Sequence, residues 1–428
     1  MLLRRGRRRL AAIALAVAAA GAAAAAQGDW RTLALQSFDE TWKTVNDTFY
    51  DPTFGGLDWP GVRDEYRPRM TAAASPDAAR DVIREMLGRL GQSHFGLLSA
   101  GSDRNTLPGD AALAITVRAI ADGMLVTRVE AESAAARAGL AAGDLILDVD
   151  GDALAGAAAT ASRRPLVEAW QQANRALHGA SGSTARLRVR ATDGRVRTVD
   201  VVREVASGQP VQLGNLPMLR VHVDAEERST PQGRRVGVIA FNYWMTGVNA
   251  PLANAIDRFR HADGLVIDLR GNPGGLADMM RGVAGHVMND TDLLGRMKMR
   301  TTTLEFRANP RRSTADGRLV DPYAGPVAIL VDELSGSTSE CFAGGLQSLG
   351  RARIFGRQTM GQALPALTKR LPNGDALMYV IGDFVTSTGR RLEGQGVIPD
   401  EALPLTVSGV SGGKDPDLDA ALRWLDRR

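Results

Sequence analysis

Cysteine and histidine are scarce in this chain, which has one cysteine, Cys341, and five histidines among 428 residues. A single cysteine cannot form an intramolecular disulfide. The sequence contains neither an H-E-x-x-H motif nor a close cysteine and histidine cluster, so nothing in it supports a metal site. The glycines Gly264, Gly274 and Gly275 lack the lysine and hydroxyl pair that a phosphate-binding loop needs. We therefore expect neither a metal nor another cofactor.

Positive charge is also scarce once the first residues are set aside. The chain has 52 lysines and arginines against 48 acidic residues, and five of the arginines lie within the first nine positions. Without those five, 47 basic residues nearly balance the 48 acidic ones. This balance excludes a basic protein that binds nucleic acid.

An apolar leader follows the first arginines. Residues 10–20 form an apolar run, and an alanine tract ends near Ala26. A charged start, a short apolar run and small residues are typical of a secretory signal peptide, and the run is too short to favour a membrane span. We predict a signal peptide over residues 1–26 and an exported protein, periplasmic or extracellular, with no stable membrane span after signal cleavage.

Helical periodicity dominates residues 27–105. In a first helical stretch, one apolar stripe is formed by Phe38, Trp42, Val45 and Phe49. A second helix is predicted over residues 77–90, where apolar side chains also share one face. This region is therefore predicted to be a small N-terminal helical domain.

The rest of the chain shows two further patterns. Residues 106–205 have short strand-like runs and one predicted helix at residues 165–178, which indicates a β-rich domain. From residue 206 to residue 428, apolar strands alternate with helices, as is typical of a β/α core. The predicted fold class is therefore α/β and multidomain.

A turn rich in serine and glycine carries the strongest chemical signal. An apolar strand at residues 326–332 leads to the sequence L-S-G-S-T-S-E at residues 334–340 and then to a helical segment. Such a turn can expose a serine hydroxyl beside backbone N–H groups, as acyl transfer requires. Taken alone the motif is weak, because serine and glycine also cluster in ordinary turns that cap helices.

The order of several motifs is more specific than any one of them. D-L-R-G-N-P-G-G at residues 268–275 precedes the serine turn, and G-R-Q-T-M-G at 356–361 and L-E-G-Q-G-V-I-P-D at 392–400 follow it. This series resembles the C-terminal processing (tail-specific) peptidase family and its tricorn-type relatives, over nearly the whole chain after residue 28. The resemblance implies a β/α, crotonase-like serine peptidase core that acts on polypeptide substrates.

Residues 129–151 resemble the PDZ domain seen in this family. Such a domain binds an extended peptide by adding it as a strand to a sheet edge. We predict a peptide strand in a PDZ-like groove, beside residues 113–117. The alternative that stays open is a spacer domain that binds nothing.

The resemblance assigns roles within the serine turn and the glycine loop. The middle serine, Ser337, is the nucleophile, and the serines on either side shape the turn. The N–H groups of Thr338 and Gly275, with Gly274 as a further donor, form the oxyanion hole. Glu340 caps the following helix or hydrogen-bonds nearby.

The general base is where the sequence departs from the best-known members of the family. They carry a lysine at the position of Gln362, and an amide cannot take the serine proton. The tricorn-type branch instead uses an adjacent Ser-His pair and a glutamate, which match Ser93, His94 and Glu393 here. The resemblance implies that His94 transfers protons, Ser93 orients His94, and Glu393 joins the network through Ser93.

These assignments predict a serine endopeptidase that cleaves polypeptides through an acyl-enzyme. One alternative is a catalytically inactive peptide-binding protein that retains the fold and the PDZ groove, with Gln362 marking the loss of activity. Another is a lipid carrier of the retinoid type, because related folds occur in such proteins. The presence of Ser337 and Glu393 argues against this second alternative.

Overall fold

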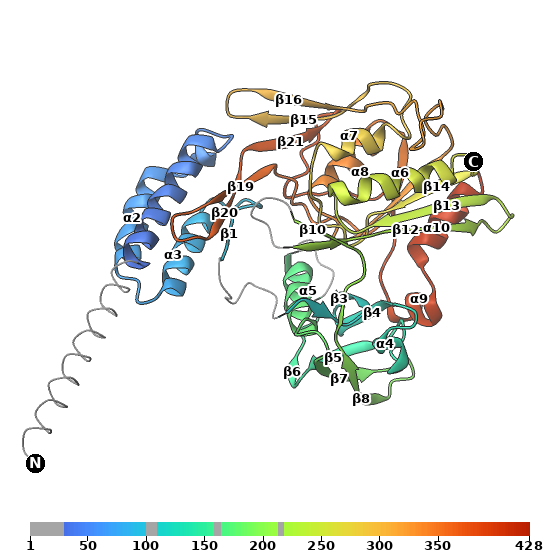
Figure 1. Cartoon of the computed structure of the whole chain (residues 1–428), viewed down its shortest axis with the longest axis horizontal. Coiled ribbons are helices and arrows are strands. Elements are labelled where there is room, and N and C mark those ends of the chain that lie inside the picture. The colour runs from blue at the N-terminus through green and yellow to red at the C-terminus, as the bar shows by residue number, and fades with distance from the viewer. Residues whose placement is uncertain (1–29, 100–108, 158–163, 213–217) are drawn as a thin grey trace, which may run out of the picture.

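The structure is a computed structural model that describes residues 30–99, 109–157, 164–212 and 218–428 (Figure 1). It is a mixed α/β structure with N-terminal helices, a β-rich unit and a β/α core, as the sequence predicted. The predicted signal peptide lies outside the described residues. None of the helices in the described part has the length and apolar character needed to cross a membrane.

The N-terminal helices surround a core of aromatic and aliphatic side chains. Asp58 and Ser75 cap the second and third helices by accepting backbone N–H groups, and proline lies in the first turn of both. Large side chains that are 0–1% exposed form the core: Phe38, Trp59, Ile83 and Met86. The elements are a helix over residues 30–48, η1 (Phe54–Gly56), α2 (Trp59–Thr71) and α3 (Pro76–Gly88).

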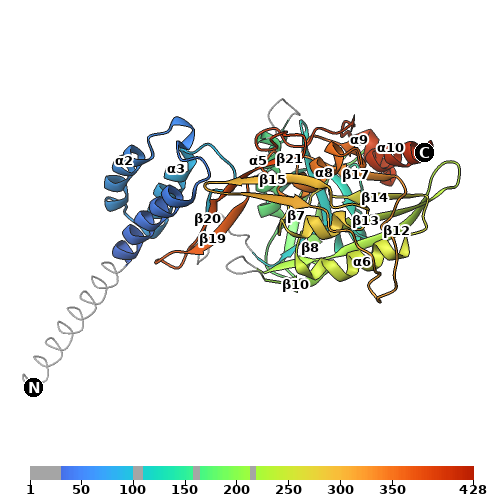
Figure 2. The same cartoon turned by 90° about the horizontal axis from the view of Figure 1, so that it is seen from above.

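A small antiparallel sheet connects these helices to the rest of the molecule. Its strand order is β1-β20-β19, so the strand after the helices pairs with strands from the C-terminal half. Leu364, Leu377 and Val380 from this later part of the chain belong to the helical core. Figures 1 and 2 both show β19 and β20 beside the N-terminal helices. The strands are β1 (Gly96–Leu98), β19 (Ala366–Arg370) and β20 (Ala376–Val380).

The β-rich unit is a sheet with strand order β3-β4-β5-β7-β8, and β3 lies at its edge. Helix α5 packs against β3 and buries Ala173 and Leu177. The predicted peptide-binding segment at residues 113–117 therefore runs into an edge strand next to a helix. The elements are β2 (Ala111–Ala112), β3 (Ile115–Ile120), β4 (Gly123–Val129), α4 (Ala134–Arg137), β5 (Leu145–Val149), β6 (Asp152–Ala153), α5 (Arg164–Leu177), β7 (Thr184–Arg190), β8 (Val196–Val202) and β9 (Glu204–Val205).

The core is a six-stranded sheet with the order β12-β13-β14-β17-β18-β22, parallel from β13 onward. Alternate residues of its strands face opposite sides, so Ile267 and Ile329 contact one helical layer while Val266 and Leu330 contact another. The strands are β12 (Val223–Ser229), β13 (Arg235–Phe241), β14 (Gly264–Asp268), β17 (Val327–Val331), β18 (Ala352–Gly356) and β22 (Glu401–Ala402).

The helices cover the two faces of this sheet unequally. One face carries η2 (Thr246–Val248), α6 (Asn249–Arg258), α7 (Met279–Ala284) and α8 (Thr338–Ser348), and the other carries α10 (Pro416–Leu425). Proline follows the cap Asp415 at the start of α10.

The remaining elements join the units to one another. The segment with α9 (Val407–Val410) and η3 (Ser411–Gly413) packs on the β-rich unit, where Val410 contacts Leu125 and Leu145. A second three-stranded sheet has the order β16-β15-β21, with β15 (Leu293–Met299), β16 (Thr303–Arg307) and β21 (Gly382–Thr386). Strands β10 (Gln209–Val211) and β11 (Leu219–Val221) form a separate antiparallel pair.

A buried ion pair holds α3 to the loop before β20. Arg80 donates from Nε and a terminal nitrogen to the two oxygens of Asp375, at 2.9 and 3.1 Å, and the Asp375 side chain is 0% exposed. We expect Arg80→Met to destabilise the protein by about 3–5 kcal/mol, because it removes the cation that pairs with a buried carboxylate. Urea unfolding followed by tryptophan fluorescence measures this change.

The matched control is Lys43→Met, which breaks an ion pair with Asp47 whose side chains are 65% and 47% exposed. Exposed pairs contribute about 0–1 kcal/mol, so this variant should unfold close to wild type. Equal unfolding midpoints for the two variants would contradict the assigned role of the buried pair.

Candidate active site

Ser337 stands at a strained turn between β17 and α8. Its backbone angles are φ 51° and ψ −117°. Residues other than glycine rarely adopt such a conformation, which costs about 1–3 kcal/mol. Between residues 327 and 346, Ser337 is the only residue that is not buried. The fold therefore presents one serine from an otherwise buried segment, as an attacking nucleophile requires.

The serines on either side of Ser337 tie the turn to the glycine loop. Ser335 Oγ donates a hydrogen bond to Leu269 O at 2.7 Å, and Ser339 Oγ donates one to Asn272 O at 3.0 Å. Both serines are fully buried. These hydrogen bonds fix the path of the turn, so the two side chains shape it as predicted.

Two residues of the glycine loop, Gly274 and Gly275, have no room for a side chain. A Cβ on Gly274 would lie 2.6 Å from the Cβ of Ser337, and a Cβ on Gly275 would lie 2.3 Å from Trp244 O. Their φ angles of 104° and 144° also favour glycine. Glycine at position 274 lets the backbone of the loop lie directly against the serine turn, and glycine at position 275 lets it lie against the backbone of Trp244.

The predicted oxyanion donors differ in what their N–H groups contact. The Gly274 N–H donates to Asn272 Oδ1 at 3.0 Å, so it is already engaged. Among the residues that the structure describes, the N–H groups of Gly275 and Thr338 donate to no protein acceptor. The Thr338 hydroxyl donates to Gly275 O at 2.9 Å and holds these two residues together. Two uncommitted N–H groups beside Ser337 are suited to stabilising an oxyanion.

The fully buried carboxylate of Glu340 joins the serine turn to residues 359–362. Burial raises the pKa of Glu340 to about 7, and the hydrogen bonds that it accepts oppose this rise. The donors are Ser337 N (3.1 Å), Gly361 N (2.7 Å), Gln362 N (2.9 Å) and the Thr359 hydroxyl (2.5 Å).

Gln362 lies beside Ser337, at the place where lysine-dependent relatives are expected to carry their base. Its backbone oxygen accepts a hydrogen bond from Ser337 N at 2.8 Å. The amide side chain has no basic site that could take the serine proton. A base for Ser337 therefore has to come from another part of the chain.

Ser93, His94 and Glu393 lie together in one hydrogen-bonded group. Glu393 accepts hydrogen bonds from the backbone N–H and from the hydroxyl of Ser93, each at 2.9 Å. Ser93 Oγ lies 2.7 Å from His94 Nδ1. The fold brings these residues together because Ser93 and His94 precede β1, and β1 pairs with β20 of the C-terminal half.

The hydrogen bonds of Ser93 determine the tautomer of His94. The Ser93 hydroxyl has one proton, which it donates to the carboxylate of Glu393. The 2.7 Å contact with His94 therefore has Nδ1–H as its donor and Ser93 Oγ as its acceptor. Burial lowers the pKa of His94 to about 4, so the ring is neutral at neutral pH, with a free lone pair on Nε2. This is the form that a general base requires.

A short backbone segment links the group around Ser337 to the group around His94. Ala363 N donates to Glu393 Oε2 at 2.9 Å, and the preceding residue, Gln362, contacts Ser337. Within the described part of the chain, His94 and Ser337 share no hydrogen bond with each other. The structure thus assembles each group separately and connects them through residues 361–363.

Sequence reasoning missed the number of contacts that Glu340 makes, and it missed Thr359 and Asn272. The position of Glu340, three residues after the N-cap Ser337, is the usual place for a glutamate that accepts the N-cap N–H. That signal predicts one of its hydrogen bonds. Nothing local in the sequence indicates the contacts with Thr359 and residues 361–362, because they depend on the folded chain.

Three segments match known protein families. Residues 235–403 match peptidase family S41, residues 33–88 match the tricorn protease C1 domain, and residues 125–161 match a PDZ domain. Together with the fold and the partly exposed serine at a strained turn, these matches define a serine-type peptidase with a PDZ domain. The segment that matches peptidase family S41 contains the glycine loop and the serine turn, and this confirms the resemblance to C-terminal processing peptidases that the motif order predicted.

Similar proteins cover most of the chain. A carboxyl-terminal-processing protease of Picosynechococcus sp. is 27% identical over 406 residues, which cover 90% of this chain and 88% of that protein. Carboxyl-terminal-processing peptidase 3, chloroplastic, of Arabidopsis thaliana is 25% identical, over 86% of this chain and 69% of that protein. Putative tricorn protease homolog 2 of Streptomyces coelicolor is 27% identical, over 92% of this chain and 32% of that protein.

Solved structures show the same fold. The photosystem II D1 C-terminal processing protease has a TM-score of 0.58 and 21% identity, with 92% of this chain and 97% of that chain covered. Mature CPAF has a TM-score of 0.60 and 17% identity, with 93% and 96% covered. At these identities the likeness concerns the fold alone.

We expect Glu340 to set the acid limb of the pH profile. Protonation near its raised pKa of about 7 places an O–H among groups that donate hydrogen bonds to the carboxylate. The hydrogen bonds that Glu340 accepts from Ser337 and residues 361–362 are then weaker. Wild-type kcat/KM should therefore fall as the pH drops through about 7. Glu340→Gln, which resembles the protonated form, should be about 100-fold slower at pH 8 and should lack this limb.

The measurement is kcat/KM for a peptide substrate from pH 4 to pH 9. The exposed Glu305→Gln on β16 is the control and should keep the wild-type profile. His94, whose pKa burial lowers to about 4, would produce a limb at much lower pH. An unchanged limb near pH 7 in Glu340→Gln would show that another group controls it.

Proposed function

We propose that this peptidase is an exported endopeptidase that cleaves polypeptides through an acyl-enzyme on Ser337, with His94 as its general base. The observation that carries the proposal is the contact between Ser93 and Glu393, which leaves Nε2 of a neutral His94 free to accept a proton. The strained, partly exposed Ser337 and the two uncommitted N–H groups beside it support the same reaction.

The first half-reaction forms the acyl-enzyme. Ser337 Oγ attacks the scissile carbonyl carbon while its proton passes to His94 Nε2. The negative charge that develops on the carbonyl oxygen accepts hydrogen bonds from the N–H groups of Thr338 and Gly275. When the tetrahedral intermediate collapses, the C–N bond breaks and His94 returns the proton to the leaving amine.

The second half-reaction releases the acyl group. Water gives a proton to His94 Nε2 and attacks the same carbonyl, and Ser337 leaves with that proton. In both halves the imidazolium of His94 donates through Nδ1 to Ser93, whose hydroxyl donates to the negative Glu393. This chain stabilises the charged ring, which burial alone disfavours. His94 and Ser337 come within hydrogen-bonding reach in the substrate complex, because such contacts often tighten only there.

The PDZ domain supplies a second place for polypeptide. Among the described strands β3 pairs with β4 alone, so its other edge lies next to α5, and an extended peptide added there would pair with residues 115–117. Residues 1–26 would direct export to the periplasm or the extracellular space. Substrates would therefore be unfolded segments or chain ends that reach both the PDZ edge and Ser337.

The competing function is peptide binding without turnover. The observation in its favour is Gln362, which occupies the place of a lysine base beside Ser337. A labelling experiment distinguishes the two functions. Only a peptidase has an activated serine hydroxyl that an electrophile modifies rapidly.

The test is turnover of an unstructured protein by wild type, Ser337→Ala and His94→Ala, from pH 5 to pH 9. We expect wild-type cleavage and a loss of about 1,000-fold or more in both variants, because the nucleophile and its base act as a unit. The control is His261→Ala, which replaces an exposed histidine and should cleave at the wild-type rate.

Two results would count against the mechanism. Full activity in His94→Ala would assign the base to another residue. A wild type that binds the substrate without cleaving it, and that resists a fluorophosphonate, would favour the binding protein.

A further inference from the structure

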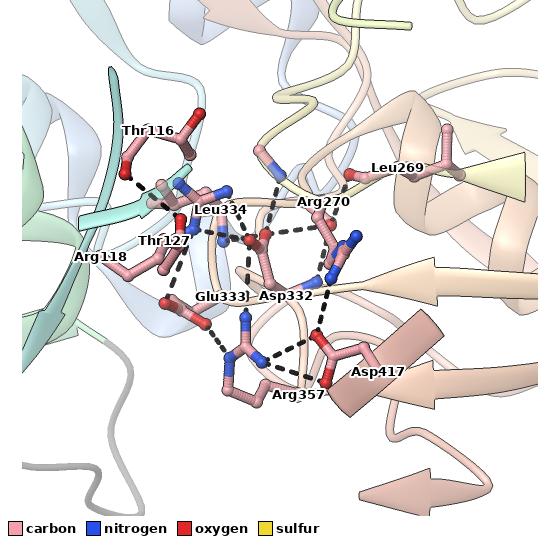
Figure 3. Close-up of polar contacts among 12 residues, drawn as sticks. Thr116, Arg118, Thr127, Leu269, Arg270, Asp332, Glu333, Leu334, Arg357 and Asp417 are labelled. Carbon is pink, nitrogen blue, oxygen red and sulfur yellow. Dashed lines mark hydrogen bonds and ion pairs between the residues drawn. The ribbon is translucent and has the colours of Figure 1, made fainter. Parts of the chain in front are cut away.

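A buried arginine of the PDZ domain reaches into the catalytic core. Arg118 lies on β3, is 6% exposed, and donates from Nε to Asp332 Oδ2 at 2.6 Å (Figure 3). Its guanidinium also lies against the glycine loop, since a Cβ on Gly271 would be 2.8 Å from one of its nitrogens. A backbone oxygen of the same strand, Val117 O, accepts a hydrogen bond from Arg118 at 2.9 Å and fixes the side chain.

The partner of Arg118 orients both loops of the active site. Asp332 is 0% exposed and directly follows β17. Its Oδ1 accepts hydrogen bonds from Gly271 N at 2.9 Å and from Leu334 N at 3.0 Å. Gly271 begins the glycine loop that ends at Gly275, and Leu334 begins the turn that contains Ser337. One oxygen of this carboxylate thus faces the PDZ domain, and the other holds both catalytic loops.

The nearest alternative cation is committed elsewhere. Arg357 is 3.8 Å from Asp332, and it also pairs with Glu333 at 2.8 Å and with Asp417 of α10 at 3.0 Å. Figure 3 shows Arg357 between these acids, on a different side of Asp332 from Arg118. Without Arg118, the buried Asp332 carboxylate would keep only this shared, longer contact with a cation. Such a carboxylate turns toward another donor or takes a proton, and either change disturbs its hydrogen bonds.

We propose that Arg118 is a positioning residue for the peptidase reaction, so that the PDZ domain completes the catalytic geometry of the core. It acts through Asp332, which sets the positions of the Ser337 turn and of the glycine loop. This role rests on the proposed function, because it assumes that Ser337 is the nucleophile. It requires no ligand in the PDZ groove.

The test compares Arg118→Met with Arg118→Lys and Arg128→Met on a short peptide substrate. Arg118→Met should lower kcat about 100-fold with KM within about threefold of wild type, because misplaced reacting groups affect the chemical step. Arg118→Lys keeps the charge and should recover part of the rate. Arg128 is the control, because it lies on the adjacent strand and pairs across the same boundary with Asp224 at 3.8 Å, where both side chains are more than half exposed. Arg128→Met should behave as wild type.

A second variant separates positioning from misfolding. In the double variant Arg118→Met/Asp332→Asn both charges of this pair are removed, and the side-chain amide oxygen introduced at position 332 can still accept from Gly271 N and Leu334 N. We expect this double variant to be more active than Arg118→Met alone. If Arg118→Met has the wild-type kcat, or if the double variant is as slow as Arg118→Met, the inference is wrong.

Labelling by a fluorophosphonate distinguishes this inference from the proposed function. If wild type does not label on Ser337, the proposed function fails. If wild type labels and Arg118→Met labels equally fast, only the positioning role fails. We expect wild type to label rapidly and Arg118→Met to label about 100-fold more slowly, in step with its kcat.

Discussion

The carboxylate of Glu340 is the contact on which the active site depends, because it accepts hydrogen bonds from both segments that surround Ser337. A residue with φ of 51° returns to an ordinary conformation unless its neighbours hold it. Glu340 holds it from inside the fold, where no water competes for the carboxylate. The same contact places Ala363 where its N–H meets Glu393, so one buried side chain connects the proposed nucleophile, Ser337, to the group that contains the proposed base, His94.

Three parts of the chain contribute to this site, and each does so through backbone pairing or a buried charge. The helical domain supplies Ser93 and His94, which reach the core because β1 pairs with β20. Strand β3 of the β-rich unit supplies Arg118, which pairs with Asp332. The core supplies Ser337 and the glycine loop. Under the proposed mechanism, the geometry of the site is complete only when all three parts of the chain are docked, so the folding of one part alone does not give activity.

Sequence patterns predicted the elements that local periodicity determines. The predicted helix at residues 165–178 is α5 (Arg164–Leu177), and the predicted strand at residues 326–332 is β17 (Val327–Val331). The partly exposed serine in a turn after an apolar strand also followed from the motif. The meeting of Ser93 with Glu393 came from family resemblance, because residues 300 positions apart leave no local signal.

The contacts that sequence could not predict are those between side chains and distant backbone groups. Asn272 takes the N–H of Gly274, which leaves Gly275 as the glycine with an uncommitted donor. Arg118 meets Asp332 across 214 positions, and a lone arginine on a strand gives no indication of that partner. Such contacts depend on how domains dock, and hydrophobic periodicity within a domain carries no information about docking.

The central claim is that His94 is the general base for Ser337, and reaction with a peptidyl chloromethyl ketone tests this claim most directly. In a Ser-His peptidase the serine adds to the ketone carbonyl, and the histidine displaces chloride and becomes alkylated. Mass mapping of the inactivated wild type should locate the adduct on His94, and Ser337→Ala should react much more slowly. An enzyme that cleaves peptides yet carries the adduct on another residue, with His94 unmodified, would contradict the account.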